Sequence, residues 1–251
     1  MITIPLPGNN SPLSNLISYS VSPLYEMAAS LYTLAQETPP ERFADWTEEK
    51  LDQFESARLL KEWGYFVPLF RYGIPDSFDP LHTKGVMAVD DQYEYFVTLP
   101  TDHFVRSIKP ILEEWISHHD IPPVALDLKE DSDYVKGRFS LFVSSYWQLF
   151  FEANWESIAP KFVREAERIY YSLQAISSLT TYLQTISPAI TYDNETLRLT
   201  CPSNGPSCDA SHLILYPSHY YAQEPTLTRK GLNAHLLYSI SEAASQPKTP
   251  S

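Results

Sequence analysis

Both cysteines of the chain lie in one short stretch, Cys201-Pro-Ser-Asn-Gly-Pro-Ser-Cys208. Two thiols around such a turn are compatible with a metal clip, a disulfide, a redox pair or a plain loop. A zinc knuckle has two to four residues between its cysteines and a second pair of ligands. Here six residues intervene, and the chain has no further cysteine. The intervening residues are typical of turns, so we expect a loop between two strands, with Cys201 and Cys208 as weak metal candidates.

Other residue types that could do chemistry show no reactive pattern. The seven histidines have neither His-Glu-x-x-His spacing nor a His-x-His clip, although His212, His219 and His235 share one predicted β region. The Gly-x-Ser-x-Gly elbow and the glycine-rich phosphate loops are absent. Adjacent carboxylates such as Glu113-Glu114 do not face each other on a helix. We therefore predict no catalytic residue and no cofactor, and expect that the chain is not an enzyme.

Large aromatic side chains crowd one predicted helical region and are the best candidates for a ligand pocket. Such side chains line apolar pockets, but they also fill cores. The same residues can have both roles if the core is incompletely filled. The candidate ligand-binding residues are Tyr146, Trp147, Phe150, Phe151, Trp155 and Tyr170.

Composition excludes several classes of protein. The 251 residues carry 18 Lys and Arg against 31 Asp and Glu, a formal charge of −13. Phosphate backbones repel such a surface unless a basic patch is segregated from the acid, and none is found, so we expect no direct binding of nucleic acid. No apolar stretch approaches the ~18 residues that span a bilayer, and the N-terminus does not look like a secretory signal. A membrane role is not expected, and reduced cysteines suit the cytoplasm.

The elements that must position these residues begin with helices. Ser22-Pro23 predicts a helix start, which Thr38-Pro39-Pro40 ends. A second helix is predicted over residues 47–63, with Gly64 just past its end. Further helical stretches are predicted over 90–99 and 101–118, the latter kinked or split at Pro110.

The second half of the sequence begins with an acidic connection over 120–132. After a long helical stretch, the spacing of its apolar residues changes from that of helices to that of strands. Residues 132–186 are predicted to be mostly helical, with a break near Asn154 and Pro160 and a shorter helix over 178–185. Apolar alternation then indicates a hairpin around Asp193-Asn194 and strands within 212–216 and 232–240.

This order predicts an α+β fold, in which a mostly helical body of about six to eight helices precedes a small antiparallel β unit. The expected divisions are an N-terminal segment with one strand (1–21), a helical effector or dimerisation domain (22–187), the β unit packed on it (188–241) and a flexible tail or linker (242–251).

Three short motifs resemble one family. They are Ser22-Pro-Leu-Tyr-Glu26 at the first helix, the aromatic helix from Tyr146-Trp147 to Trp155, and Leu213-Ile-Leu-Tyr-Pro-Ser-His-Tyr220 in the β unit. In this order, over roughly residues 16–241, they resemble the N-terminal region of ArsR-type bacterial transcriptional regulators. In those proteins a helical domain of unassigned function precedes a winged-helix DNA-binding domain.

The resemblance implies an effector-sensing or dimerisation module that lacks its own DNA-binding domain. The winged helix of such regulators would begin where this sequence stops at Ser251. A small apolar ligand and a homodimer are the expected partners, and the cysteines that sense metals in short ArsR proteins lie in the missing domain. Two alternatives stay open: a cytoplasmic enzyme with a site assembled from distant His, Asp and Glu residues, and an acidic scaffold for protein interactions.

Overall fold

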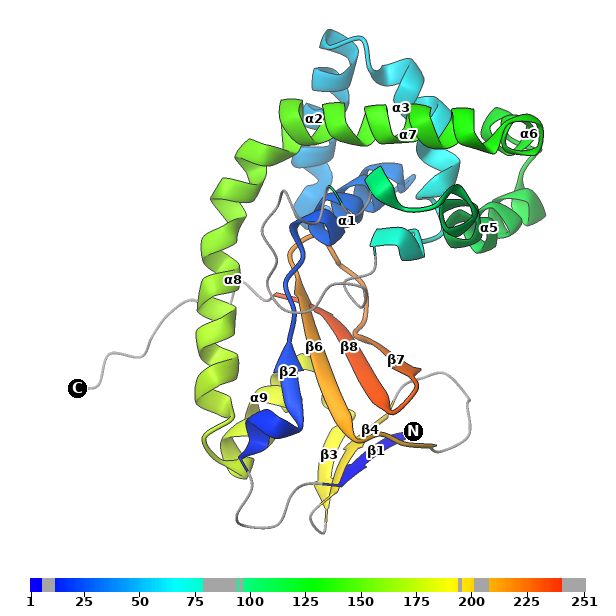
Figure 1. Ribbon diagram of the computed structural model, residues 1–251. Coiled ribbons are helices and arrows are strands. Elements are labelled where there is room, and N and C mark those ends of the chain that lie inside the picture. The colour runs from blue at the N-terminus through cyan, green and yellow to red at the C-terminus, as the bar shows by residue number, and fades with distance from the viewer. Residues whose placement is uncertain (6–11, 79–93, 95–96, 194–195, 201–207, 241–251) are drawn as a thin grey trace. The chain divides into compact units, whose positions relative to one another are not determined.

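The computed structural model describes residues 1–5, 12–78, 94, 97–193, 196–200 and 208–240. The chain forms two compact units (Figure 1). The helical unit is Ser22–Ser157, and the α/β unit joins Met1–Val21 to Ile158–Ser251. The predicted α+β class is confirmed. The boundary expected between residues 187 and 188 lies inside the α/β unit, because segment 1–21 and the long helix after residue 158 share a unit with the later strands.

The first helix of the helical unit begins where the sequence predicts. Helix α1 is Pro23–Ala35, with proline in its first turn. The Ser22 Oγ atom accepts a hydrogen bond of 3.1 Å from the Tyr25 backbone N–H. This bond satisfies one of the N–H groups that a helix start leaves without a partner.

The predicted helix over 47–63 is wrong, because it is two helices, α2 (Ala44–Ser56) and α3 (Leu60–Phe66). The Arg58 N–H donates to the Glu55 carbonyl, and the Leu59 N–H donates to the Phe54 carbonyl. These two bonds define a Schellman motif, which places Arg58 at a φ of 59°. Glycine is the usual residue at that position, so an arginine gave no stop signal, and Gly64 lies inside α3.

Replacing Arg58 with glycine is expected to raise the free energy of unfolding by up to about 1 kcal/mol. A left-handed residue with a side chain costs about 1–2 kcal/mol, and the extra freedom of glycine in the unfolded chain offsets part of the gain. Urea unfolding of the full chain measures the change. The matched control is Lys61→Gly inside α3, which should destabilise by about 1 kcal/mol. A loss of stability in both variants would contradict the strain argument.

The next helices correct two further expectations. Helix α5 runs unbroken over Thr101–His118 with Pro110 inside it, so the predicted split does not occur. Helix α6, Pro123–Glu130, lies where a connection was predicted. It starts with Pro123 in its first turn and buries Val124 and Ala125. Most of the helix predicted over 90–99 falls outside the described residues.

A long helical stretch follows. Helix α7 (Ser132–Tyr146), a π-helical segment (Trp147–Phe151) and helix α8 (Glu152–Ser172) follow one another directly. The predicted break near Asn154 and Pro160 is therefore wrong, since Pro160 lies within α8. The irregularity lies earlier, in the π-helical turn. Helix α9, Ile176–Ile186, confirms the predicted shorter helix.

The core of the helical unit is mostly aromatic. Phe54 is fully buried and makes edge contacts with the rings of Trp63, Phe142, Tyr146 and Phe150. Around Phe139 the ring packing continues through Phe66, Phe70 and Phe104. Short 3-10 turns at Glu41–Phe43, Val67–Leu69 and Asp76–Phe78 bury Phe43, Leu69 and Phe78.

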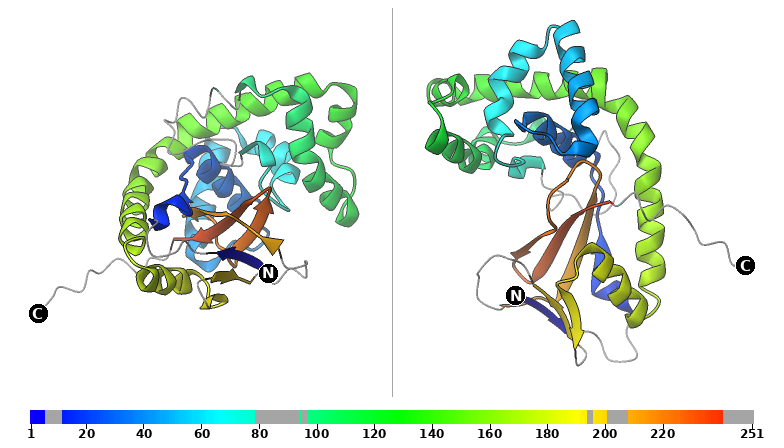
Figure 2. Two further views of the ribbon diagram at one scale, coloured as in Figure 1. Left: turned by 60° about the horizontal axis from the view of Figure 1, so that its bottom comes forward. Right: turned by 180° about the vertical axis from the view of Figure 1, so that it is seen from behind.

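The α/β unit contains two four-stranded sheets (Figures 1 and 2). One has the order β3-β4-β1-β5, formed by Ile190–Asp193, Thr196–Leu199, Ile2–Pro5 and Cys208–Asp209. The other has the order β2-β6-β8-β7, formed by Ile17–Tyr19, His212–Ser218, Asn233–Ser239 and Thr226–Lys230. The predicted hairpin is confirmed as β3 and β4, paired from Ile190 opposite Leu199 to Asp193 opposite Thr196.

The sheets are mixed, which corrects the prediction of an antiparallel unit. Strands β2 and β8 both run parallel to β6, and β1 runs parallel to β5. The reason is strand β7, which was not predicted from the sequence. Of its residues 226–229, whose burial is described, Leu227 is buried and the other three are exposed. Strand β7 returns the chain to the end of the sheet at which β6 began. Strand β8 then lies between β6 and β7, antiparallel to β7 and parallel to β6.

A single apolar cluster joins both sheets to the two flanking helices. It includes Ile4 of β1, Leu197 of β4 and Leu213 of β6, together with Ile169 of α8 and Leu183 of α9. Strands β1 and β2 contribute Ile2, Ile4 and Ile17 to this cluster, so the first 21 residues are an integral part of the unit. Helices α8 and α9 thus each have one face fixed against the sheets.

Candidate functional site

A buried carboxylate lies at the centre of the candidate site. Glu165 is on the face of α8 that also buries Ile158, Phe162 and Ile169, and it is 2% exposed. Glutamate is almost never fully buried unless it is paired. Its pairing partners therefore define the site.

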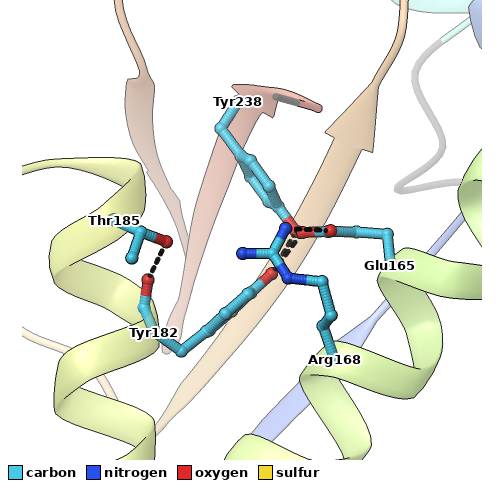
Figure 3. A network of polar contacts seen from close by, with 5 residues as sticks. All are labelled: Glu165, Arg168, Tyr182, Thr185 and Tyr238. Carbon is cyan, nitrogen blue, oxygen red and sulfur yellow. Dashed lines mark hydrogen bonds and ion pairs between the residues drawn. The ribbon is translucent and has the colours of Figure 1, made fainter. Parts of the chain in front are cut away.

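Glu165 has three side-chain partners from three elements (Figure 3). Its Oε1 atom accepts hydrogen bonds from the hydroxyls of Tyr182 on α9, at 2.7 Å, and Tyr238 on β8, at 3.0 Å. Its Oε2 atom accepts a 2.7 Å hydrogen bond from Nη1 of Arg168, one helical turn further along α8. The guanidinium lies 5.5 Å from the centre of the Tyr182 ring. One carboxylate thus joins α8, α9 and the second sheet.

The hydroxyls of Tyr182 and Tyr238 also contact each other, so the cluster has fewer hydroxyl protons than close oxygen–oxygen contacts. Their hydroxyl oxygens are 2.6 Å apart. With Glu165 ionised opposite Arg168, two phenolic protons serve three close oxygen contacts. At any instant one of the three contacts therefore has no proton in it. The network has more than one hydrogen-bond arrangement with the same atoms in place.

Burial keeps both phenols protonated. Removal from water raises the pKa of Tyr182 above its ordinary value, and the nearby Glu165 charge adds to this effect. Burial likewise raises the pKa of Tyr238 well above its ordinary value, with further contributions from Tyr182 and Glu165. The charged form of each phenol is disfavoured both by low dielectric and by a like charge. Both hydroxyls are therefore hydrogen-bond donors throughout the physiological pH range.

One side of this network opens into a cavity of about 480 Å³, which we call the Glu165 cavity. The volume is within the range of small-molecule sites. Charged groups at its wall include Glu165, Arg168 and Glu224, and apolar ones include Ile186 and Pro225. The described lining residues are Glu165, Arg168, Thr185, Ile186, Ala222, Gln223, Glu224, Pro225, Tyr238 and Ser239.

A second, shallower groove of about 560 Å³ lies along α8 and α9. We call it the α8–α9 groove. Arg168 and Thr185 line both it and the Glu165 cavity. Its described lining residues are Arg168, Tyr171, Ser177, Ser178, Thr181, Tyr182 and Thr185. The guanidinium of Arg168 is therefore accessible from two directions.

The aromatic candidates from the sequence are in part packed together. Tyr146, Phe150 and Phe151 are buried, and Trp147 and Trp155 are half-buried. The Phe151 ring stacks with that of Trp155 and has a tilted contact with that of Trp147. The Tyr146 hydroxyl is 2.7 Å from Ser30 Oγ. Because Ser30 donates its proton to the Met27 carbonyl, Tyr146 is the donor. These contacts are those of a filled core, and ligand binding there stays a prediction.

Tyr170 is separate from the other five aromatic candidates. It lies on the part of α8 that belongs to the α/β unit, and its side chain is exposed. The five others belong to the helical unit. The sequence grouped them because they follow one another along one helical stretch.

The histidines of the β region do not form a cluster. His212 is the first residue of β6, and His219 follows its last residue, Ser218. His235 stacks on Tyr216 of the neighbouring strand. His212 accepts from Ser18 Oγ at 2.8 Å and donates to the Asn15 carbonyl at 3.2 Å, which joins β2 to β6. Among the described residues no group of three or more His, Cys, Asp and Glu side chains could hold a metal ion.

Of the two cysteines, one can be placed. Cys208 is half-buried on β5, and its backbone N–H donates to the Met1 carbonyl. Cys201 lies outside the described residues. The loop prediction and the metal candidacy of this pair therefore stay predictions.

The sequence interpretation did not single out Glu165 as a site residue. A signal was available in the helical spacing. Ile158, Phe162 and Ile169 define an apolar stripe, and Glu165 falls on the same stripe. A carboxylate inside an apolar stripe indicates a buried, paired charge. Tyr182 and Tyr238, its partners from distant segments, gave no comparable signal.

None of the helices in the described parts of the chain is long and apolar enough to cross a membrane. No family model matches the chain, and neither curated proteins nor solved structures give a match.

Proposed function

We propose that this chain is the effector-sensing module of an ArsR-like transcriptional regulator, and that the effector binds in the Glu165 cavity. The observation that carries the sensing role is the buried carboxylate with two phenols and a guanidinium at the wall of that cavity. The regulatory role rests on the resemblance of the three sequence motifs. The charge of −13 favours a module that does not itself contact nucleic acid.

The cavity chemistry favours a small molecule of mixed polarity. The Arg168 guanidinium has several N–H donors, of which its contact with Glu165 uses Nη1. A hydrogen-bond acceptor on the ligand suits the remaining donors. Ile186, Ala222 and Pro225 offer apolar contacts to the rest of the molecule. This ligand class extends the apolar ligand that the aromatic helix suggested.

A ligand at this place has a physical route to the rest of the unit. An acceptor that hydrogen-bonds Arg168 competes with Glu165 for the guanidinium. Glu165 is also the acceptor for Tyr182 on α9 and Tyr238 on β8, so this competition changes the contacts that join three elements. A ligand that binds one arrangement better than the other shifts the population toward it.

Thermal unfolding in the presence of a metabolite panel tests the proposal. The panel contains carboxylic acids, amides and aromatic alcohols at millimolar concentration. We expect at least one compound to stabilise the full chain, because a ligand at 100 times its Kd adds about 2.7 kcal/mol. Failure of every compound would count against the sensing role.

A cavity-filling variant locates the binding site. Ala222→Trp adds an indole to the cavity wall and should weaken binding of any such compound at least tenfold. The matched control is Ala189→Trp, the same change at an exposed position of the same unit, and it should leave Kd unchanged. Equal binding by both variants would place the site elsewhere, with the aromatic helix as the next candidate.

A further inference from the structure

The α8–α9 groove differs in chemistry from the Glu165 cavity. Arg168 and Thr185 line both, but the Glu165 cavity also has two carboxylates at its wall, those of Glu165 and Glu224. Among the residues that the structure describes, no carboxylate lines the groove, and Arg168 is its one charged residue. On a chain with a formal charge of −13, the groove is therefore a place where an anion meets a positive charge.

A row of hydroxyl side chains forms the α9 wall of the groove. Ser177, Thr181 and Thr185 line it, and a spacing of four residues places them on one face of the helix. All three are exposed. Thr181 and Thr185 are one helical turn apart, about 6 Å along the helix axis. One small molecule in the groove can therefore reach more than one hydroxyl oxygen of α9.

The existing hydrogen bonds of the two threonines determine what they can bind. Thr181 Oγ1 donates to the Ser177 carbonyl at 2.9 Å, and Thr185 Oγ1 donates to the Tyr182 carbonyl at 2.6 Å. A hydroxyl has one proton and two acceptor lone pairs. Each threonine thus uses its proton within α9 and keeps acceptor capacity. Both oxygens suit ligand groups that donate hydrogen bonds, such as the hydroxyls of a sugar.

Arg168 offers the opposite chemistry, hydrogen-bond donors that carry a positive charge. Its side chain is one-third exposed, and its guanidinium lies over the Tyr182 ring (Figure 3). The ion pair with Glu165 uses Nη1, which leaves N–H groups of the other nitrogens for a second acceptor. Guanidinium binds carboxylate and phosphate groups through pairs of parallel hydrogen bonds. An oxyanion is therefore the ligand group that suits Arg168.

We propose that the α8–α9 groove binds a polyhydroxylated anion, a sugar acid or a sugar phosphate, at a site separate from the effector site of the Glu165 cavity. The oxyanion accepts hydrogen bonds from Arg168, and the sugar hydroxyls donate to Thr181 and Thr185. The groove volume of about 560 Å³ is within the range of small-molecule sites. Tyr171 also lines the groove and is 69% exposed, so its ring offers an apolar surface to the C–H face of a sugar.

Arg168 links binding in the groove to the Glu165 network. An oxyanion in the groove competes with Glu165 for the guanidinium, and Glu165 is also the acceptor for Tyr182 and Tyr238. If both sites are filled, each ligand must alter the affinity of the other by the same factor. Only this coupling rests on the proposed function, because the groove can bind its anion whether or not the cavity holds an effector.

Isothermal titration calorimetry of the full chain tests the site, with D-gluconate and glucose 6-phosphate as probes. We expect at least one probe to bind about tenfold or more tightly than glucose, which lacks the anionic group. The same probe should also bind more tightly than its simple anion, acetate for gluconate or inorganic phosphate for the sugar phosphate. Failure of both probes to bind, or equal binding of the simple anions, would overturn the proposal.

A pair of threonine variants tests the α9 wall. Thr181→Val should weaken binding of the probe about fivefold, because it removes one acceptor. Thr180→Val is the matched control. Thr180 donates to its own helix in the same way, to the Ile176 carbonyl at 2.9 Å, but it is not among the described residues that line the groove. Its replacement should leave Kd unchanged, and equal weakening in both variants would contradict the role of Thr181.

Two tryptophan variants separate this proposal from the sensing role. Thr181→Trp fills the groove and should abolish binding of the probe. Ala222→Trp adds its indole to the Glu165 cavity, which Thr181 does not line, and should leave probe binding intact. The reverse pattern would place the probe in the Glu165 cavity, which overturns the groove site and leaves the sensing role supported. Unchanged binding in both variants would overturn the groove site as well.

Discussion

Replacing Glu165 with leucine is expected to lower the free energy of unfolding by about 3–5 kcal/mol, the usual cost of removing one partner from a buried ion pair. The change leaves Tyr182 and Tyr238 with buried hydroxyls that lose their shared acceptor. Each such loss costs about 1–3 kcal/mol. The Arg168 guanidinium loses its counter-charge as well, although it is one-third exposed and recovers part of this in water.

Urea unfolding measures this prediction against a control on the same helix. Glu156→Leu removes an exposed carboxylate from α8 and should change stability by less than about 0.5 kcal/mol. Hydrogen exchange should show the loss of protection in α8, α9 and β8, the three elements that Glu165 joins. Equal effects of the two leucine variants would show that the buried network contributes nothing to stability.

The phenols provide an internal check on the same network. Tyr182→Phe or Tyr238→Phe alone should cost about 1 kcal/mol, because the remaining tyrosine still donates to Glu165. The double variant should cost clearly more than the sum of the two, since the buried carboxylate then keeps Arg168 as its sole partner in the network. Residues in one hydrogen-bond network characteristically show such coupling. Strict additivity would contradict the shared-acceptor arrangement.

Replacing Phe54 with alanine is the second large change, with an expected loss of about 3–5 kcal/mol. Phe54 is fully buried and contacts four other aromatic rings. Its removal opens a cavity whose lining loses dispersion contacts that water cannot replace. If this aromatic cluster were an incompletely filled ligand pocket, the truncation would be tolerated more easily, because the neighbouring rings would already lack close contacts.

Leu149→Ala is the matched control for Phe54. Leu149 is an exposed apolar residue in the adjoining π-helical segment, so its truncation should cost less than about 0.5 kcal/mol. Urea unfolding gives the two values, and hydrogen exchange should assign the Phe54 effect to the helical unit. A Phe54→Ala variant as stable as Leu149→Ala would support the pocket interpretation of the aromatic helix.

The features of the fold that could be predicted from the sequence are those formed by residues close to one another along the chain. Ser22-Pro23 marks the start of α1 because the cap is made by residues adjacent in sequence. The β3–β4 hairpin is likewise a neighbour-to-neighbour pairing. Arg58 was not predictable in this way. Any residue can be forced into a left-handed conformation when tertiary packing requires it, and arginine carries no marker of that conformation.

Long-range pairing explains what was missed at the site. Glu165 meets Tyr182 and Tyr238, which are 17 and 73 residues away, and no local pattern records such a meeting. The parallel pairing of β6 with β8 depends on the intervening return strand β7, whose single buried leucine gave a weak pattern. The aromatic helix was identified as a cluster for the right reason, its spacing, but spacing does not distinguish a filled core from a pocket.

The joining of segment 1–21 to residues beyond 158 has a consequence for how the protein is made. On a ribosome that adds about 5–20 residues per second, strands β1 and β2 emerge first. Their partners β4, β5 and β6 emerge about 200 residues later. For roughly ten to forty seconds the apolar side chains of Ile2, Ile4 and Ile17 have no native partner strand. The helical unit between them can be completed during this interval. During synthesis, strands β1 and β2 therefore complete their sheets only after most of the chain has been made.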